Sequence, residues 1–513
     1  MMGFIAALVL AAGTASGGLQ GDSGGWNFVR PYVVPEPAEM TYVSNVCVRL
    51  DEATRVRLVT GEARNADWLR DHLAAALHIR PAVEVSTGEG LPTGEAYRLS
   101  ADASGFTVQA ADLAGVRNAF QTLRQVLVAE RGVAAAKVWI SPAFEISDRP
   151  AHDFRAVHVC WFPETEARHV ERLIRAAAAC KFNCVILESW GTFRFETNPW
   201  YGWPEGSMTK DVICRLADLA RDLGVTLVPQ INVFGHAAAS RGGAGKHAGI
   251  DLHPERASLF EPRAGWTWCL TNPEVFRVQC ELLAEMHEAF GNPPYFHIGC
   301  DEADQPTCPR CRATDWPVTV GEHIRKVRDF LAKRGARALM WHDMLVSKDE
   351  PAFADLPRYP VNGASKEVCG KLLARIPEDV VVCDWYYGPE RETFPTWKRF
   401  AETGHAVVPC SWDDVFGTVS MGRAAEKAKV FGFMATTWHT PCGTALYRIL
   451  LPAAYAAWGQ TDAYMRYPLY GHTCDKHDFA TIWRQAGWDM GMSSEDEAGW
   501  DRDSVPVRTT TGK

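Results

Sequence analysis

The strongest constraint on the fold is an alternation of strand-like and helix-like segments that begins near residue 154 and occurs eight times. The apolar runs of strand length are 156–160, 184–187, 226–233, 295–298, 336–341, 380–383, 406–410 and 431–436. Amphipathic stretches of helical period, such as 167–179 and 274–290, lie between most of them. Near-continuous apolar strands separated by helices indicate parallel pairing with both faces of the sheet covered.

Eight such units in roughly 300 residues predict an α/β fold of the (β/α)8 type, a TIM barrel. An open, doubly wound parallel sheet is the alternative. It would more often carry a Gly-rich phosphate-binding turn after its first strand, and none follows the run at 156–160. We therefore expect a catalytic barrel over residues 150–460.

Residues 27–147 predict a separate, small α+β domain. Strand-like runs such as 55–59 alternate there with helical patterns at 65–77 and 114–128. The boundary is expected at Pro150, because proline discourages the continuation of either regular element.

The two ends of the chain carry weaker patterns. Residues 1–17 resemble the apolar core and small-residue cleavage site of a signal peptide, although no Lys or Arg precedes the apolar run. That run is too short to span a bilayer. We expect a secreted or periplasmic protein, with the cytoplasm as the alternative location. Residues 461–513 are expected to form a partly disordered C-terminal extension.

Net charge argues against two classes of partner. The chain of 513 residues has a formal net charge of −9 and no Lys/Arg-rich tract. Nucleic acid and anionic membranes are therefore poor partners. Nothing in the pattern fixes an oligomeric state.

The carboxyl ends of the strands are where a barrel of this type forms its site. Five of the eight predicted strands deliver a tryptophan there: Trp190, Trp341, Trp385, Trp412 and Trp438. Tryptophans that merely fill a core would not all be placed at one end of the strands. An aromatic-walled cup with carboxylates at its floor suits a sugar ring and an oxocarbenium-like transition state.

Asp301 and Glu302 follow the fourth strand directly, after the small-residue turn Gly299-Cys300. Two carboxyl groups held this close cannot both ionise freely, so the pKa of one rises, as a general acid near neutral pH requires. An acidic pair on a solvated loop is the alternative. Their place among the strand-end tryptophans favours a catalytic pair.

A metal-dependent hydrolase is the rival class. Four histidines fall on or after strands, namely His158, His236, His297 and His342, but no His-x-His or His-Glu-x-x-His pair anchors a metal. Cys308 and Cys311 form one half of a zinc knuckle without a second pair at knuckle spacing. A local disulfide or free thiols are favoured over a metal there, and we predict neither a metal nor a cofactor.

The segment from His297 to Glu302 matches the pattern His-x-Gly-x-Asp-Glu, and through it the chain resembles glycoside hydrolase family 20, the β-N-acetylhexosaminidases. The resemblance covers nearly all of residues 30–460, including family blocks at 146–150 and 229–236. Glu188 stands where most members have His, and the blocks around Trp341, Trp385 and Trp438 are similar to those of the hexosaminidase D-like branch.

The resemblance implies an exo-acting, retaining hydrolase that removes terminal β-linked N-acetylhexosamine from a glycan. In that family the sugar's own 2-acetamido oxygen attacks the anomeric carbon and forms an oxazolinium intermediate. Glu302 would be the general acid and then the base, and Asp301 would orient the acetamido group. The implied substrate-binding residues are His236, Glu188, Trp341, Asp343, Trp385, Trp412, Asp413, Trp438 and His297.

Several positions depart from the family pattern. No Arg stands at the end of the first strand, where most members grip the sugar's hydroxyls, and Cys160 replaces an Asp of the hexosaminidase D-like branch. Thr440 replaces a Glu, and the acetamido-binding Tyr after strand 7 has no clear equivalent. Two alternatives follow: a carbohydrate-binding pseudoenzyme, or a glycosidase of altered sugar specificity.

Overall fold

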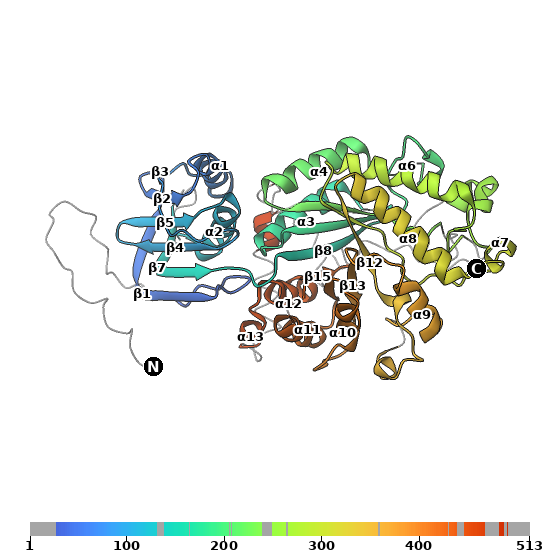
Figure 1. Cartoon of the computed structure of the whole chain (residues 1–513). Helices are drawn as coiled ribbons and strands as arrows, with labels where there is room; N and C mark the ends of the chain where they lie inside the picture. The colour runs from blue at the N-terminus through green and yellow to red at the C-terminus, as the bar shows by residue number, and fades with distance from the viewer. Residues whose placement is uncertain are drawn as a thin grey trace, which may run out of the picture.

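A computed structural model of the chain describes residues 27–130, 138–163, 165–204, 206, 208–238, 249–262, 265–357, 360–428, 430–438, 446–466, 482–486 and 490. The expected signal peptide and most of the expected C-terminal extension lie outside the described residues. Two units lie side by side in Figure 1: a sheet with two helices, followed by a larger strand-and-helix barrel.

The first unit is a seven-stranded mixed sheet in the order β1-β7-β4-β5-β2-β3, with β6 paired to β7. Its strands are β1 (Glu39–Leu50), β2 (Arg55–Thr60), β3 (Ala82–Ser86), β4 (Tyr97–Asp102), β5 (Gly105–Ala110), β6 (Val128–Ala129) and β7 (Trp139–Asp148). The helices are α1 (Asn65–Leu77) and α2 (Leu113–Val126). Alternate residues of β2 and β5 point into a buried core shared with both helices, which confirms the predicted α+β unit.

Eight parallel strands close the second unit into a barrel, in chain order. They are β8 (Phe154–Trp161), β9 (Cys184–Ser189), β10 (Thr226–Gln230), β11 (Tyr295–His297), β12 (Arg337–Trp341), β13 (Val381–Trp385), β14 (Val407–Ser411) and β15 (Gly432–Thr436). The last strand pairs with the first from Gly432 opposite Phe154 to Thr436 opposite His158. That closure confirms the barrel and excludes an open sheet.

The third strand is shorter than its apolar run. We expected a strand over 226–233, but β10 ends at Gln230. The chain continues beside the end of β11, where Ile231 N–H donates to His297 C=O and Val233 N–H donates to Ile298 C=O. The apolar run extends past the strand because the side chains of Ile231 and Val233 are still buried, although their backbone no longer belongs to β10.

Helices surround the barrel, as Figure 1 shows. The longer ones are α3 (Ala167–Ala179), α4 (Lys210–Asp222), α6 (Pro273–Ala289), α8 (Trp316–Lys333), α9 (Lys366–Leu373), α10 (Pro395–Glu402), α11 (Val415–Ala428) and α12 (Tyr447–Trp458). Short helices are α5 (Gly249–Leu252), α7 (Pro309–Arg312) and α13 (Thr461–Tyr464), with 3-10 turns at Pro199–Tyr201, Pro254–Leu259, Asp343–Leu345 and Pro351–Phe353.

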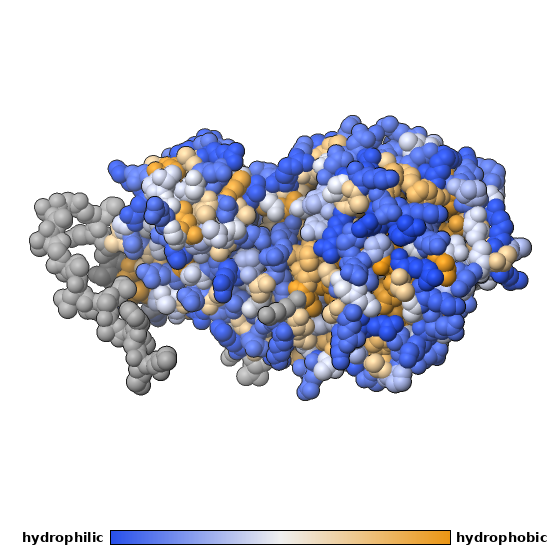
Figure 2. Space-filling model, in the orientation of Figure 1, coloured by the Kyte–Doolittle hydropathy of each residue, from blue (hydrophilic) through white to orange (hydrophobic). Residues whose placement is uncertain are grey.

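Local sequence explains where these helices begin. Thr209 caps α4 by accepting a hydrogen bond from Val212 N–H, and Asn272 caps α6 ahead of Pro273 in its first turn. No described helix is both long and apolar enough to cross a membrane. Figure 2 shows a largely hydrophilic face with scattered hydrophobic residues.

A buried polar cluster joins the two units. Asp148, the last residue of β7, accepts hydrogen bonds from Lys181 Nζ and Tyr97 OH at 2.7 Å each and from Trp458 Nε1 at 2.8 Å. The side chains of Asp148 and Lys181 are fully shielded from solvent. Burial lowers the pKa of Lys181, although the Asp148 carboxylate opposes that shift.

A second ion pair reinforces this junction. Arg155, near the start of β8, makes two contacts with the Glu95 carboxylate of the first unit, at 2.5 and 2.8 Å. Together with the Asp148 cluster it lies at the amino ends of the barrel strands. The first unit is therefore attached at the end opposite to the strand ends that were predicted to carry the chemistry.

Candidate active site

The ends of β10 and β11 approach each other so closely that two glycines are required there. A Cβ atom on Gly235 would lie 2.0 Å from Asp301 C=O, and one on Gly299 would lie 2.0 Å from Asn232 Oδ1. Gly299 also has a positive φ of 65°. Both positions bring the loop bearing Asn232 and the loop bearing Asp301 into direct contact.

Backbone strain is concentrated at the same end of the barrel. Seven non-glycine residues in the described part of the chain have positive φ, and four of them follow barrel strands β10, β11 and β15: His236 (51°), Cys300 (78°), Glu302 (46°) and Trp438 (43°). Such conformations cost on the order of 1 kcal/mol or more each and persist only where the surroundings enforce them. Such strain gathers at functional sites more often than elsewhere, so it favours this end of the barrel as the site.

Asp301 and Glu302 point to one histidine but differ in exposure. Asp301 is 4% exposed, and its Oδ1 accepts a hydrogen bond from Asn232 Nδ2 at 3.0 Å. His236 Nε2 lies 3.3 Å from Asp301 Oδ2 and 3.1 Å from Glu302 Oε2. The Glu302 side chain is 47% exposed, so a substrate can reach it while Asp301 stays fixed beneath.

The backbone of Glu302 is held on both sides. Its N–H donates to Asp343 Oδ2 at 2.9 Å, and its C=O accepts from Trp266 Nε1 at 2.7 Å. The Trp266 ring also packs against His236, with ring centroids 4.2 Å apart. These contacts fix the direction in which Glu302 leaves the chain. Sequence reasoning did not single out Trp266, because along the chain it lies far from the carboxyl end of any predicted strand.

Asp343 provides an unusual carboxyl group below this pair. Burial, and then the nearby Asp301 charge, raise the pKa of Asp343 to about 7. Its oxygens also accept hydrogen bonds from Asn362 Nδ2 at 3.0 Å and from Trp385 Nε1 at 3.4 Å. Asp343 can therefore hold a proton near neutral pH.

Asp384, on the neighbouring strand β13, is similarly perturbed. Burial raises the pKa of Asp384 to about 7, and burial lowers the pKa of the adjacent His342 to about 3. Asp384 Oδ1 lies 3.6 Å from His342 Nε2. At neutral pH the imidazole is uncharged, so it cannot compensate a charge on Asp384.

Aromatic rings pack against one another beside the carboxylates. Trp341 is fully buried, with ring centroids 4.4 Å from His297 and 5.7 Å from Trp438. Tyr387 stacks on Trp385 at 5.0 Å and meets the edge of Trp412 at 5.5 Å. His297, Trp341 and Trp385 are the last residues of β11, β12 and β13. Tyr387, Trp412 and Trp438 follow β13, β14 and β15, and the six rings form one continuous wall.

Tyr387 is a member of this wall that sequence reasoning missed. Its hydroxyl accepts a hydrogen bond from Trp438 Nε1 at 2.9 Å, and burial raises its pKa above the usual range. A usable signal was present. Side chains two positions apart share one face of an extended segment, so Tyr387 follows Trp385 into the site.

Two predicted substrate-binding residues lie differently from the rest. Glu188 is 1% exposed and held by His158 Nε2 at 3.1 Å and Cys160 Sγ at 3.5 Å, on the neighbouring strand. Asp413 is exposed and joins none of the hydrogen bonds described above. Thr440 lies outside the described residues. The other predicted site residues contact one another around Asp301 and Glu302. They are His236, His297, Trp341, Asp343, Trp385, Trp412 and Trp438.

The histidine-based metal hydrolase gains no support. In the part of the chain that the structure describes, His158, His236, His297 and His342 form no common group at metal-ligand spacing. Two other groups do reach such spacing: His158 with Cys160 and Glu188, and Glu261 with three cysteines.

Comparison with known families gives two matches that follow one another along the chain. Residues 30–149 match the family model described as glycosyl hydrolase family 20, domain 2. Residues 187–457 match glycosyl hydrolase family 20, catalytic domain. The first match covers the mixed sheet, and the second covers the barrel from the end of β9 to α12.

Individual relatives are distant. A beta-hexosaminidase of Porphyromonas gingivalis is 24% identical over 366 residues, which cover 61% of this chain and 45% of that protein. The chain therefore spans less than half the length of this curated relative. In the solved structures, an exo beta-N-acetylglucosaminidase from Vibrio harveyi in complex with N-acetylglucosamine has a TM-score of 0.66 at 18% identity, covering 92% of this chain and 81% of that one. A beta-N-acetylhexosaminidase from Bacteroides fragilis has a TM-score of 0.62 at 19% identity, covering 84% and 91%. These similarities show a shared fold.

Proposed function

The chain belongs to glycosyl hydrolase family 20, and from that premise we propose that it removes terminal β-linked N-acetylhexosamine from glycans by substrate-assisted, retaining hydrolysis. The observation that carries this proposal is the unequal placement of two adjacent carboxylates. Asp301 is buried and held by Asn232 and His236, whereas the Glu302 side chain is half exposed, so that a leaving group can reach it.

Glu302 is proposed as the general acid. It would give its proton to the glycosidic oxygen while the sugar's 2-acetamido oxygen attacks the anomeric carbon from the opposite face, so that the bond to the leaving group breaks as the oxazolinium ring closes. Water would then attack the anomeric carbon and give a proton back to the Glu302 carboxylate. Exposure on one side and backbone anchoring on the other suit a group that must protonate and deprotonate in turn.

Asp301 is proposed to orient the acetamido nitrogen and to stabilise the positive charge that develops on it. A buried carboxylate with a fixed direction does this better than a solvated one, because the surroundings need not reorganise when charge appears. Asn232 and His236 fix Asp301, and His236 Nε2 is close enough to both carboxylates to respond to the charge on either.

The aromatic wall is proposed to hold the sugar ring, with Trp341 at its floor and Trp438 at its side. Tyr387 is our candidate for contact with the acetamido group, because its ring stacks on Trp385 and its hydroxyl is positioned in the aromatic wall by Trp438 Nε1. We propose that Glu188 acts indirectly by holding His158, since its carboxylate is covered. The closer relation to the hexosaminidase D-like branch stays a prediction.

A pair of substrates tests the role of the acetamido group. We expect turnover of an aryl β-N-acetylglucosaminide or β-N-acetylgalactosaminide and none of the matching aryl β-glucoside. Asp301→Asn should lower kcat on the acetamido substrate, while inhibition by a thiazoline mimic of the bicyclic intermediate should be strong for the wild type and weak for this variant. Equal turnover of both substrate types would contradict the mechanism and favour a glycosidase of altered specificity.

Loss of turnover is the second possibility, and the missing first-strand Arg is the observation that favours it. A pseudoenzyme would bind sugars saturably without hydrolysing any member of a broad glycan panel. Calorimetric binding of N-acetylglucosamine combined with no detectable product after prolonged incubation would establish that outcome. Measurable turnover that Glu302→Gln abolishes would remove it.

A further inference from the structure

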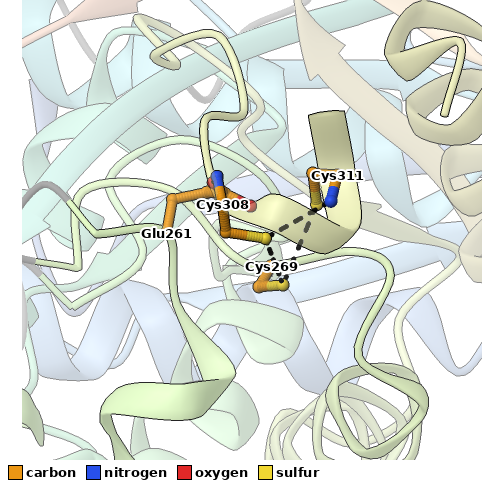
Figure 3. Close-up of side chains that lie close together, drawn as sticks. All are labelled: Glu261, Cys269, Cys308 and Cys311. Atoms are coloured by element: carbon orange, nitrogen blue, oxygen red, sulfur yellow. Dashed lines mark hydrogen bonds between the residues drawn. The ribbon is translucent and has the colours of Figure 1, made fainter. Parts of the chain in front are cut away.

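Three cysteines and one glutamate lie close together, as Figure 3 shows. Cys308 and Cys311 lie at the start and within α7, and Cys269 comes from the segment that precedes α6. Glu261 lies two residues after the 3-10 turn Pro254–Leu259. One ligand atom from each residue lies within 4.8 Å of all the others, and all four residues are buried.

The sulfur positions fit a shared metal better than a disulfide. Cys269 Sγ lies 3.5 Å from Cys308 Sγ and 3.8 Å from Cys311 Sγ. A disulfide needs about 2.05 Å between its sulfurs, and three thiols cannot pair completely among themselves. Four ligands arranged tetrahedrally at about 2.3 Å from a zinc ion would place sulfurs roughly 3.8 Å apart. The observed spacing is close to that value.

The glutamate is positioned as a fourth ligand. Its Oε2 accepts hydrogen bonds from Thr307 N–H and Cys308 N–H, each at 2.7 Å. Its Oε1 is buried and accepts no hydrogen bond from the described residues. A buried carboxylate oxygen left without a donor is costly unless a cation or a water satisfies it.

Donors around the sulfurs resemble the outer contacts of a metal-thiolate site. Cys311 N–H points to Cys308 Sγ at 3.4 Å, the Thr271 hydroxyl lies 3.1 Å from Cys311 Sγ, and Arg310 Nη2 lies 3.5 Å from Cys269 Sγ. Such contacts delocalise negative charge from thiolates and orient them toward a metal. Arg310 supplies the one positive charge among these contacts.

We propose that Cys269, Cys308, Cys311 and Glu261 bind one Zn²⁺ ion in a closed, four-coordinate structural site. Three thiolates and a carboxylate are the donor set that a d¹⁰ divalent cation accepts, and four protein ligands leave no open position for a substrate. This proposal replaces our prediction that Cys308 and Cys311 form a local disulfide or remain free thiols without a metal. The missing ligands come from 261 and 269, so no local motif could show them.

The ion would join two loops that carry the active site. Glu261 and Cys269 bracket the segment that contains Trp266, whose Nε1 binds the C=O of Glu302. The Thr267 hydroxyl accepts from Asp304 N–H at 3.1 Å, between Glu302 and Cys308. Zinc therefore holds the general-acid loop against the loop of Trp266. The proposal concerns metal content and stability, so it stands whether or not the proposed activity is found.

Metal analysis of the intact protein tests the proposal. Protein is produced with zinc in the medium and purified under reducing conditions. Inductively coupled plasma mass spectrometry should then find one zinc ion per chain. Cys308→Ser should lose stoichiometric zinc, whereas Cys214→Ser, a matched control at an exposed thiol of α4, should keep it. Wild-type protein without zinc, both as purified and after reduced apoprotein is reconstituted with zinc, would overturn the proposal.

Two further measurements remain informative if Cys308→Ser fails to fold. Thiol alkylation of the wild type should spare Cys269, Cys308 and Cys311 until a chelator is added, and should then label these three together. Arg310→Met should retain the fold but bind zinc about 10- to 100-fold more weakly in competition with a chromogenic chelator, because it removes an outer contact. If zinc and the chelator leave the alkylation of these cysteines unchanged, the ion is not bound by thiolates. An unchanged zinc affinity of Arg310→Met would strengthen that conclusion.

Discussion

Two buried aspartates show how differently this molecule uses the same side chain. At the junction of the two units, Asp148 is surrounded by Lys181, Tyr97 and Trp458, all of which donate to it. At the mouth of the barrel, Asp301 has one amide and one imidazole for partners and faces other carboxyl groups. The first arrangement satisfies its charge, whereas the second leaves charge crowded at one place.

The pKa shifts express the same contrast. The Lys181 ammonium has an opposite charge in contact, so the shift caused by its burial is opposed. Asp343 contacts no cationic side chain among the described residues, and burial together with the Asp301 charge raises its pKa to about 7. Where buried charges are paired, the result is a structural anchor; where like charges meet without a cation, proton transfer near neutral pH becomes accessible.

The largest effect on activity should come from the carboxylate pair at the carboxyl ends of the barrel strands. Glu302→Gln should lower kcat by about 10²–10⁴-fold on an aryl N-acetylhexosaminide, because the amide cannot protonate the leaving oxygen. Aglycones that need no protonation should lose less. The side chain is half exposed, so thermal unfolding should stay close to that of the wild type. A rate unchanged for every aglycone would refute the assignment of the general acid.

A substitution at the junction of the two units should lower stability and leave activity nearly unchanged. Lys181→Met leaves Asp148 buried without its cation and should cost about 3–5 kcal/mol of unfolding free energy. Activity per folded molecule should change little, because the pair lies at the far end of the barrel. Denaturant titration and active-site titration separate the two quantities. The double variant Lys181→Met, Asp148→Asn should recover part of the loss, and a failure to recover any would argue against charge as the cause.

Asp343 gives a smaller effect that depends on pH. Its pKa is about 7 in the folded protein, against 3.8 ordinarily, so between pH 4 and 7 the folded state keeps a proton that the unfolded state loses. Wild-type stability should therefore fall as pH rises through this window, relative to Asp343→Asn, with a slope approaching about 1.4 kcal/mol per pH unit. Urea titrations at several pH values measure this, and a difference independent of pH would contradict the raised pKa.

The smallest effect should come from an ion pair that belongs to neither region. Arg55 and Glu84 lie 2.7 Å apart on the exposed face of the first sheet. Arg55→Ala should cost under about 1 kcal/mol, because water and salt screen an exposed pair. Comparing this variant with Lys181→Met at equal ionic strength measures what burial adds to a charge pair. A loss as large as that of Lys181→Met would show that burial is not the deciding factor.

The spacing of apolar residues along the sequence predicts most of the fold. Eight apolar runs at strand length required a closed or open parallel sheet, and β15 pairing with β8 selected the barrel. The strand-end rule also located Asp301, Glu302, Asp343 and most of the tryptophans. What periodicity could not show is contact between loops. Trp266 and Cys269 reach their partners through tertiary packing, and neither lies at a strand end.

Burial was the other quantity that position alone could not supply. Glu188 follows the rule for strand ends but is covered by His158 and Cys160, because β8 and β9 pair there. Tyr387 lies two residues beyond Trp385, outside the positions that the strand-end rule selects. Its face of the chain follows from the pleat, so this omission was one of reasoning rather than of information.

The junction also has a consequence for how such proteins can be recombined. Asp148 belongs to the first unit, yet it binds Trp458 at the end of the last barrel helix, and Ala151 N–H donates to Trp458 C=O just before the first barrel strand. The residue that fastens the beginning of the barrel to its end is thus encoded outside the barrel. A gene fragment beginning at residue 150 would keep the Ala151–Trp458 hydrogen bond but would lose the Asp148 contacts with Trp458 and Lys181. An exchange of one unit for that of a relative would therefore have to preserve Asp148 together with Lys181 and Trp458.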